Sequence, residues 1–190
     1  DRNWTPLLVA ASHAQRDMVT LLLEKGADPK AKDNNDVTAL HLASMGTQPG
    51  IAKELLDRKV DINTRNKKGA TPLHFAAGAG QMAMVEFLVE RGADLNAKDE
   101  EGNTVLHLAC LNLQPSIVKL LLDKKMDVQC RSLKDATPLH FAARADRPAI
   151  VTVLLEQPGI DIKAKDADGN TPLHLAAMNG SQQVAELLIA

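Results

Sequence analysis

A short phrase recurs along this chain at an almost constant interval, and it limits the available folds more than any other feature does. Each copy begins with threonine and continues as a Leu- and Ala-rich segment; "ATPLHFAA" occurs twice without change. The leading residues of the six copies are Thr5, Thr38, Thr71, Thr104, Thr137 and Thr171. Their separations are 33, 33, 33, 33 and 34 residues, and Pro158 is the simplest choice for the extra residue. Such a period predicts a stack of small, similar units rather than one central core.

Each copy carries the signals of two helices joined by a turn. Threonine is a good N-cap, and proline directly after it suits the first helical position. A second apolar segment such as "MVEFLVE" follows with helical spacing. Ala39 and Val105 replace the proline in two copies, which predicts weaker preorganisation of those two first helices. We expect Pro49, Pro115 and Pro148 to begin the second helix of their copies.

The segments between copies predict tight turns with positive φ. Two residues before each threonine stands a residue type that tolerates this conformation, namely Asn3, Asp36, Gly69, Gly102, Asp135 and Gly169. Gly26 and Gly92 stand where a left-handed residue would end the second helix. Lys59 and Lys125 occupy that glycine position in two copies, so we predict positive φ there at a cost of about 1 kcal/mol each.

The stretches "GNTPLHLAAMNGSQQVAELL" (169–188) and "GATPLHFAAGAGQMAMVEFLVERGADLNAKD" (69–99) resemble ankyrin repeats, and the resemblance extends over the whole chain. It implies an all-α solenoid of stacked helix-turn-helix units joined by β-hairpin-like fingers, with a concave side built from fingers and first helices. A departure is Leu8, which replaces the usual histidine in the first copy. The expected single domain, 1–190, contains the repeats 1–33, 34–66, 67–99, 100–132, 133–166 and 167–190.

Composition excludes several classes of partner. The net charge of −2 gives no basic footprint for a nucleic-acid backbone. The chain has no apolar run long enough to span a bilayer, so we expect no direct membrane contact. Cys110 and Cys130 are too few for a disulfide framework and favour a reducing compartment, the cytoplasm or the nucleus.

Five of the six histidines recur in the threonine-led phrase: His41, His74, His107, His140 and His174. Equivalent residues of stacked helices lie roughly 10 Å apart, which is too far for two of them to bind one ion. The resemblance implies a structural role instead, with each histidine tying adjacent repeats together. We therefore predict no metal site, no cofactor, no catalytic residues and no enzyme activity, because no unique set of groups converges.

A longer period of two repeats is superimposed on the first. Residues 38–70 are identical to residues 104–136 at 17 of 33 positions, but to residues 71–103 at only 10. Fingers of the even repeats are basic, whereas their neighbours carry Asp and Glu. Duplication of a two-repeat block explains this without any function, yet it also predicts a groove with alternating charge.

We predict that the chain is a non-enzymatic scaffold that binds a protein or peptide partner through its concave side. The predicted partner-binding residues are Trp4, Met45, Arg65, Lys67, Lys68, Glu100, Glu101, Leu111, Arg131, Lys134, Arg144 and Met178. For Trp4, an interface anchor and a cover for the first repeat are equally weighted alternatives. The alternative function is a structural spacer or an autoinhibitory segment whose partner lies in the same polypeptide.

Two further expectations concern modification and context. Asn63 and Asn96 occupy the finger asparagine position, and the ankyrin resemblance implies that such residues can be hydroxylated. The chain starts inside a finger and ends in an apolar second helix without a polar cap, which favours a fragment of a longer protein.

Overall fold

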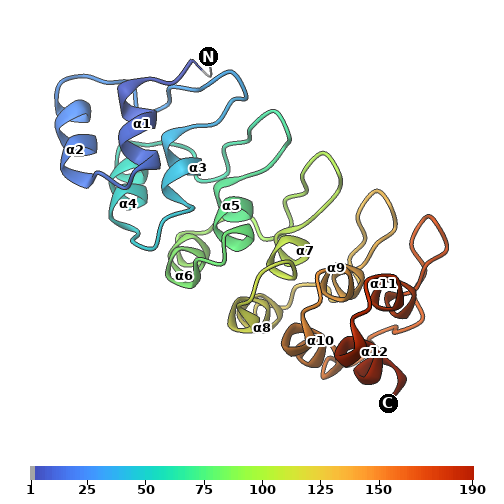
Figure 1. The fold of residues 1–190 in the computed structure, drawn as a ribbon. Helices are drawn as coiled ribbons and strands as arrows, with labels where there is room; N and C mark the ends of the chain where they lie inside the picture. The colour runs from blue at the N-terminus through green and yellow to red at the C-terminus, as the bar shows by residue number, and fades with distance from the viewer. Residues whose placement is uncertain (1–2) are drawn as a thin grey trace. The chain divides into compact units, whose positions relative to one another are not determined.

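The computed structural model describes residues 3–190, and over that range it is all-α, with twelve helices and no sheet. The described residues form two compact units that meet between residues 99 and 100, which coincides with a predicted repeat boundary. Each unit consists of three helix pairs, and extended finger loops run from one pair to the next (Figure 1). Within the described range, no helix has the length and apolar character needed to cross a membrane.

The first unit contains α1 to α6, which are Pro6–Ser12, Arg16–Glu24, Ala39–Ala43, Gly50–Asp57, Pro72–Gly78 and Met82–Glu90. The first helices of its repeats pack in a row, α1 on α3 and α3 on α5, and each packs on the second helix of its own repeat. Leu40, Leu73 and Leu88 are fully or almost fully buried at these contacts. The unit is therefore a stack of helical hairpins.

The second unit contains α7 to α12, which are Val105–Ala109, Pro115–Asp123, Pro138–Arg144, Pro148–Leu155, Pro172–Met178 and Gln182–Ile189. Here α9 packs between α7 and α11, and α10 packs between α8 and α12. Leu106, Leu139 and Leu154 are fully buried. The fold class predicted from the repeats, an all-α ankyrin-type stack, is confirmed.

The expected left-handed residues have that conformation. All six turn residues placed two positions before the threonines have positive φ, from 54° at Asn3 and Asp135 to 80° at Gly169. Gly26 and Gly92 have φ of 90° and 83°. The fingers are held mainly by turns, and among the described residues the isolated antiparallel bridge lies between Lys32 and Thr38.

One detail of the helices differs from the sequence prediction. Pro115 and Pro148 do begin their helices, but Pro49 is the N-cap, and α4 begins one residue later at Gly50. The helices without proline, α3 and α7, still begin directly after their threonines, and they are shorter at their C-terminal ends.

The reason for the shortening lies in the connection between the paired helices. In the other four repeats, this connection contains a residue with positive φ, namely Ala14, Gly80, Asp146 or Gly180. Repeats two and four have Thr47 and Leu113 at the equivalent position, without positive φ. In these two repeats the first helix therefore ends earlier, and the connection to the second helix runs through a Gln-Pro pair, Gln48-Pro49 or Gln114-Pro115.

Lys59 and Lys125 have φ of 63° and 65°, as predicted, so both helix ends place a side chain in the left-handed region. Replacing either lysine by glycine removes the steric cost, and we expect each change to raise the free energy of unfolding by about 1 kcal/mol. Urea denaturation of Lys59→Gly and Lys125→Gly measures the effect. The control is Lys53→Gly, an exposed position inside α4, where glycine should destabilise by about 1 kcal/mol. Destabilisation by all three changes would contradict the prediction.

Candidate functional site

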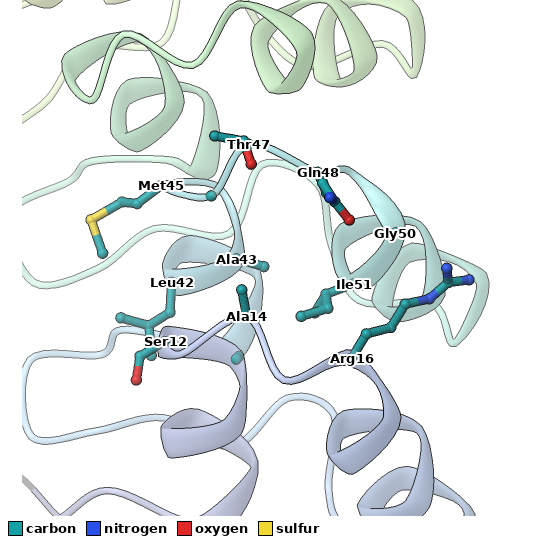
Figure 2. A pocket seen from close by; sticks show the side chains of 12 residues that line it. Ser12, Ala14, Arg16, Leu42, Ala43, Met45, Thr47, Gln48, Gly50 and Ile51 are labelled. Atoms are coloured by element: carbon teal, nitrogen blue, oxygen red, sulfur yellow. The ribbon is translucent and has the colours of Figure 1, made fainter.

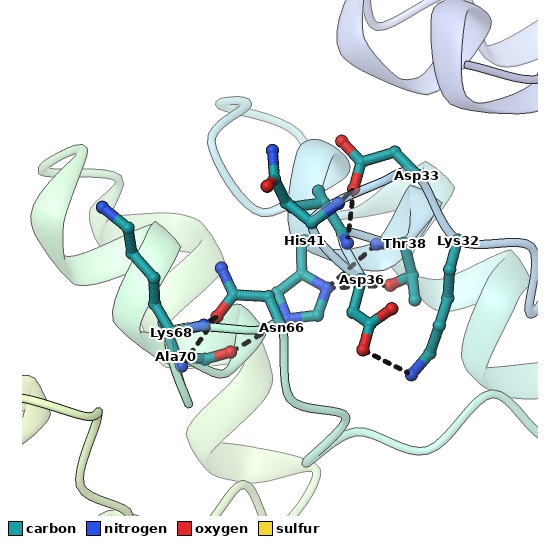
Figure 3. A network of polar contacts seen from close by, with 10 residues as sticks. Lys32, Asp33, Asp36, Thr38, His41, Asn66, Lys68 and Ala70 are labelled. Atoms are coloured by element: carbon teal, nitrogen blue, oxygen red, sulfur yellow. Dashed lines mark hydrogen bonds and ion pairs between the residues drawn. The ribbon is translucent and has the colours of Figure 1, made fainter. Parts of the chain in front are cut away.

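In the five phrases that contain histidine, the threonine and the histidine form a capping box at the start of the first helix. The backbone N–H of Thr38 donates to Nδ1 of His41 at 3.2 Å, and the Thr38 Oγ1 lies 2.9 Å from the same nitrogen (Figure 3). Thr71, Thr104, Thr137 and Thr171 repeat this arrangement. Because Nδ1 accepts from a backbone donor, it does not carry the proton.

The other ring nitrogen reaches the next repeat of the same unit. Nε2 of His41 lies 3.1 Å from the carbonyl oxygen of Ala70, just before the next threonine (Figure 3). His107 and His140 contact Ala136 and Asn170 in the same way, at 3.1 and 3.0 Å. Because a carbonyl can only accept, Nε2 must donate, and both nitrogens of these neutral rings are used to join repeats.

The pKa values of these histidines follow from their position. Burial lowers the pKa of His41 to about 4, although the hydrogen bond to the Ala70 carbonyl acts in the opposite direction. Burial also lowers the pKa of His140, opposed by the Asn170 carbonyl. At neutral pH both rings are therefore uncharged, which suits the structural role implied by the resemblance.

A polar residue five positions before Thr38, Thr71, Thr137 and Thr171 holds the finger turn, a role that was not predicted from the sequence. Oδ1 of Asp33 accepts from the N–H groups of Asn35 and Val37, both at 2.8 Å. Asn66 and Asp166 accept two N–H groups in the same way, and Ser132 accepts one. The recurrence of Asp, Asn or Ser at this position was the available signal.

Neighbouring fingers are joined by their backbones at the tips. In the first unit, the N–H of Lys67 donates to the Asn35 carbonyl at 2.9 Å. In the second unit, Leu133 donates to Glu101 at 2.8 Å, and Ala167 donates to Lys134 at 2.9 Å. The finger side chains of one unit therefore project from a connected backbone rather than from independent loops.

Two arginines predicted to bind a partner also strengthen these finger contacts. Nη1 of Arg65 donates to the carbonyl oxygens of Gly69 and Lys98, at 3.1 and 2.7 Å. Arg131 repeats the arrangement with Asp135 and Lys165, at 2.7 and 2.9 Å. Each guanidinium is exposed, but part of its hydrogen-bonding capacity is used within the fold.

The second unit has a hollow of about 390 Å³ between its fingers and its first helices, which we call the second-unit groove. It is lined by Glu101, Asn103, Ser132, Lys134, Ala136, His140, Phe141, Arg144, Asp166, Asp168, Asn170, Leu175 and Met178. Four of the predicted partner-binding residues therefore lie in one hollow: Glu101, Lys134, Arg144 and Met178.

The groove combines apolar surface with charges of both signs. Met178 is 74% exposed, and the guanidinium of Arg144 lies over the Phe141 ring, 5.1 Å from its centroid. Hydrogen bonds from Asn170 and Asp168 outweigh the effect of partial burial and lower the pKa of Asp166, so that side chain is a carboxylate at neutral pH. Within the described residues, none of the ion pairs joins a cation of this groove to one of its carboxylates.

The first unit has a smaller hollow of about 240 Å³ near the connections between its paired helices. Met45, which is 43% exposed, and Ser12 line one side, and Arg16, Gly50 and Ile51 line the other (Figure 2). The turn that follows the early end of α3 supplies Met45, Gly46 and Thr47 to this lining. Of the residues predicted to bind a partner, Met45 belongs to this hollow.

The remaining predicted residues lie outside both hollows. Trp4 is half-buried, and its Nε1 donates to Oδ2 of Asp33 at 3.2 Å, which places the indole against the first finger of its own unit. Lys67, Lys68 and Glu100 are exposed on fingers. Leu111 is half-buried, and its carbonyl oxygen accepts from Nε of Arg147 at 3.0 Å.

The two asparagines predicted as modification sites differ in their surroundings. Oδ1 of Asn63 accepts from the backbone N–H of Asp94 at 2.9 Å, so this half-buried side chain supports the neighbouring repeat. Asn96 is exposed, and its N–H donates to Asp94 Oδ1 at 2.9 Å. Hydroxylation of Asn63 and Asn96 stays a prediction.

The described residues contain no group of three or more His, Cys, Asp or Glu side chains arranged to hold a metal ion. Neither Cys110 nor Cys130 forms a disulfide. Burial raises the pKa of the Cys110 thiol, so it is protonated and unsuited to nucleophilic attack at neutral pH.

Comparison with known families agrees with the geometry. A family model described as ankyrin repeats (3 copies) matches residues 1–66, 40–132, 97–166 and 126–190, which together span the chain. A search of curated proteins finds none with significant similarity.

Acidification is expected to weaken the fold through His41. The native pKa is about 4 and the reference value is 6.5, so the unfolded chain takes up this proton first as the pH falls. The stabilising contribution is complete above pH of about 6.5 and is lost towards pH of about 4, with a loss of about 2 kcal/mol between pH 7 and 5. Urea denaturation at several pH values measures it.

The control is His41→Leu, because the equivalent residue of the first repeat is the fully buried Leu8. The variant should be less stable at pH 7, yet its stability should fall less on acidification, by about 2 kcal/mol. Parallel pH profiles for the two proteins would contradict the assignment.

Arg65→Ala is expected to lower the free energy of unfolding by about 1 kcal/mol, since two exposed carbonyl oxygens lose a charged donor. Lys68→Ala removes an exposed cation from the same finger and should leave stability nearly unchanged. Thermal and urea unfolding of both variants test this, and equal stabilities would count against a structural role for Arg65.

Proposed function

Because this chain belongs to the ankyrin repeat family, we propose that it is a scaffold that binds a partner protein or peptide through its finger and first-helix surface. Ankyrin repeats are generally protein–protein interaction modules and are typically non-enzymatic. The observation that carries the proposal is the second-unit groove. It is a hollow of about 390 Å³ to which both the fingers and the first helices contribute side chains.

The composition of the groove supports this role. Binding sites for proteins combine an apolar centre with charged and polar groups at the edge. Here Phe141, Leu175 and Met178 supply apolar surface, while Glu101 and Lys134 come from the exposed fingers. An exposed methionine adapts readily to an apolar side chain of a partner, because its thioether is flexible and polarisable.

The same reasoning extends the proposed surface to the first unit. Met45 lines the smaller hollow, and Lys67 and Lys68 are exposed finger cations. Trp4, Glu100 and Leu111 remain members of the proposed surface. Arg65 and Arg131 contribute mainly by holding the fingers in place.

We propose that the protein acts in the cytoplasm or nucleus, because its two cysteines are not joined in a disulfide. The proposed partner is a protein or peptide rather than a nucleic acid, because the chain lacks an excess of positive charge.

Selection of random displayed peptides on the full chain tests the function. Peptides that bind the groove should lose at least tenfold in affinity, about 1.4 kcal/mol, for Met178→Asp and for Lys134→Glu. Lys119→Glu, an exposed charge reversal on α8, is the matched control and should leave binding unchanged. Thermal unfolding checks that each variant remains folded. A selection that returns no peptide sensitive to the groove variants would reject the scaffold and favour a structural spacer.

A further inference from the structure

Two rows of equivalent residues, in and next to the second-unit groove, alternate in character from repeat to repeat. The floor row consists of Arg144 and Met178, which line the groove, and Leu111, which lies outside the hollow at the equivalent position of the preceding repeat; each stands seven residues after its threonine. The rim row consists of Glu101, Lys134 and Asp168, at the equivalent position of three successive fingers. The floor therefore presents an apolar, a cationic and an apolar side chain, and the rim presents an anion, a cation and an anion.

The packing of the unit places the members of the floor row side by side. Arg144 and Met178 are the last residues of α9 and α11, and Leu111 follows the C-cap residue of α7. Because α9 packs directly on both α7 and α11, neighbouring members of the row are about 8–10 Å apart. Arg144 and Met178 line the same hollow.

The central cation of the floor is positioned before any partner arrives. The Arg144 guanidinium lies over the ring of Phe141, a residue that is only 8% exposed. Nδ2 of Asn179 donates to the Arg144 carbonyl at 2.7 Å, which fixes the backbone at this point. Lys134, on the finger of the same repeat, lines the same hollow and adds a second cation. An anion at this repeat therefore meets two positive charges.

The repeat spacing selects the conformation of a bound peptide. Polyproline II rises about 3.1 Å per residue with three residues per turn, so residues i and i+3 share a face about 9.3 Å apart. In a β-strand, residues i and i+3 point to opposite faces. Of these two conformations, polyproline II is the one in which every third side chain can contact successive members of the floor row.

From these observations we infer that the second-unit groove recognises a polyproline II segment in which one acidic residue stands three positions from an apolar residue on either side. This inference rests on the proposed function and specifies its partner. The acidic side chain contacts Arg144 and Lys134, while the two apolar side chains contact Leu111 and Met178. The pattern is symmetric, so either chain direction satisfies it.

The rim row supplies discrimination against other charge patterns. Glu101 and Asp168 flank the central cations, so an acidic residue opposite either flanking repeat is repelled. In a peptide with acidic residues at both ends and an apolar residue at its centre, the apolar side chain faces Arg144 and Lys134, and the acidic side chains face Leu111 and Met178. Its binding should be the weakest.

The test uses the full chain and the labelled peptide Leu-Pro-Pro-Glu-Pro-Pro-Leu, with affinity measured by fluorescence anisotropy. Replacing its Glu by Gln, or moving the Glu by one position to another face of the helix, should weaken binding at least tenfold. The reversed peptide Glu-Pro-Pro-Leu-Pro-Pro-Glu should not bind measurably. Equal affinity for all four peptides, or no binding by any, would overturn the inference.

Protein variants assign the contact to Arg144. Arg144→Gln should weaken binding of the first peptide at least tenfold, and Arg144→Glu should prefer a peptide with Lys in place of the central Glu. Arg91→Gln is the matched control, because Arg91 also lies over a phenylalanine ring, 4.8 Å from the Phe87 centroid, but belongs to the first unit. If Arg91→Gln weakens binding as much as Arg144→Gln does, the assignment is wrong.

The random-peptide selection described above distinguishes a failure of this inference from a failure of the proposed scaffold function. Selected peptides that depend on Met178 but lack an acidic residue between two apolar ones would overturn this inference and leave the scaffold function intact. A selection without any groove-dependent peptide would overturn both.

Discussion

The hydrogen bonds of the buried histidine are the interaction on which the rest of each unit depends. One nitrogen accepts from the threonine that begins the helix, and the other donates to the repeat that follows, as His41 does with Ala70. A single side chain thus caps the start of one helix and also fixes the position of the following repeat. Because the ring must be neutral and in one tautomer, this function is coupled to pH. In His41, His107 and His140 both ring nitrogens take part in these hydrogen bonds.

The fingers extend this order to the binding surface. Side-chain acceptors such as Asp166 hold each turn, tip-to-tip backbone bonds join neighbours, and Arg131 spans two fingers. Because the backbone that carries these charged side chains is already ordered, a partner that binds them does not also have to order the finger loops. The alternating character of the second-unit groove is therefore presented at a regular spacing, which is the condition for selecting one peptide conformation.

Residues whose role depends on local geometry were predictable. The left-handed conformations of Lys59 and Lys125 followed from the equivalence of their positions with glycine. The capping threonines followed from the preference of this residue for helix starts. Arg65 was interpreted as a free finger cation, because the carbonyl oxygen of Lys98 that it contacts lies 33 positions away in the sequence. Pro49 was placed one residue too far into its helix, since proline suits both the N-cap and the first turn in a sequence pattern.

The sequence by itself determined the repeat, its two helices, the turn conformations and the identity of the side chains in each equivalent row, because these depend on contacts within one repeat of about 33 residues. Only the tertiary structure decided which of those side chains hold the fold and which remain available to a partner. That division depends on contacts between repeats, such as those of Arg65, Arg131 and Trp4, and no local pattern encodes them. It was the packing of α9 between α7 and α11 that brought Arg144 and Met178 into one hollow.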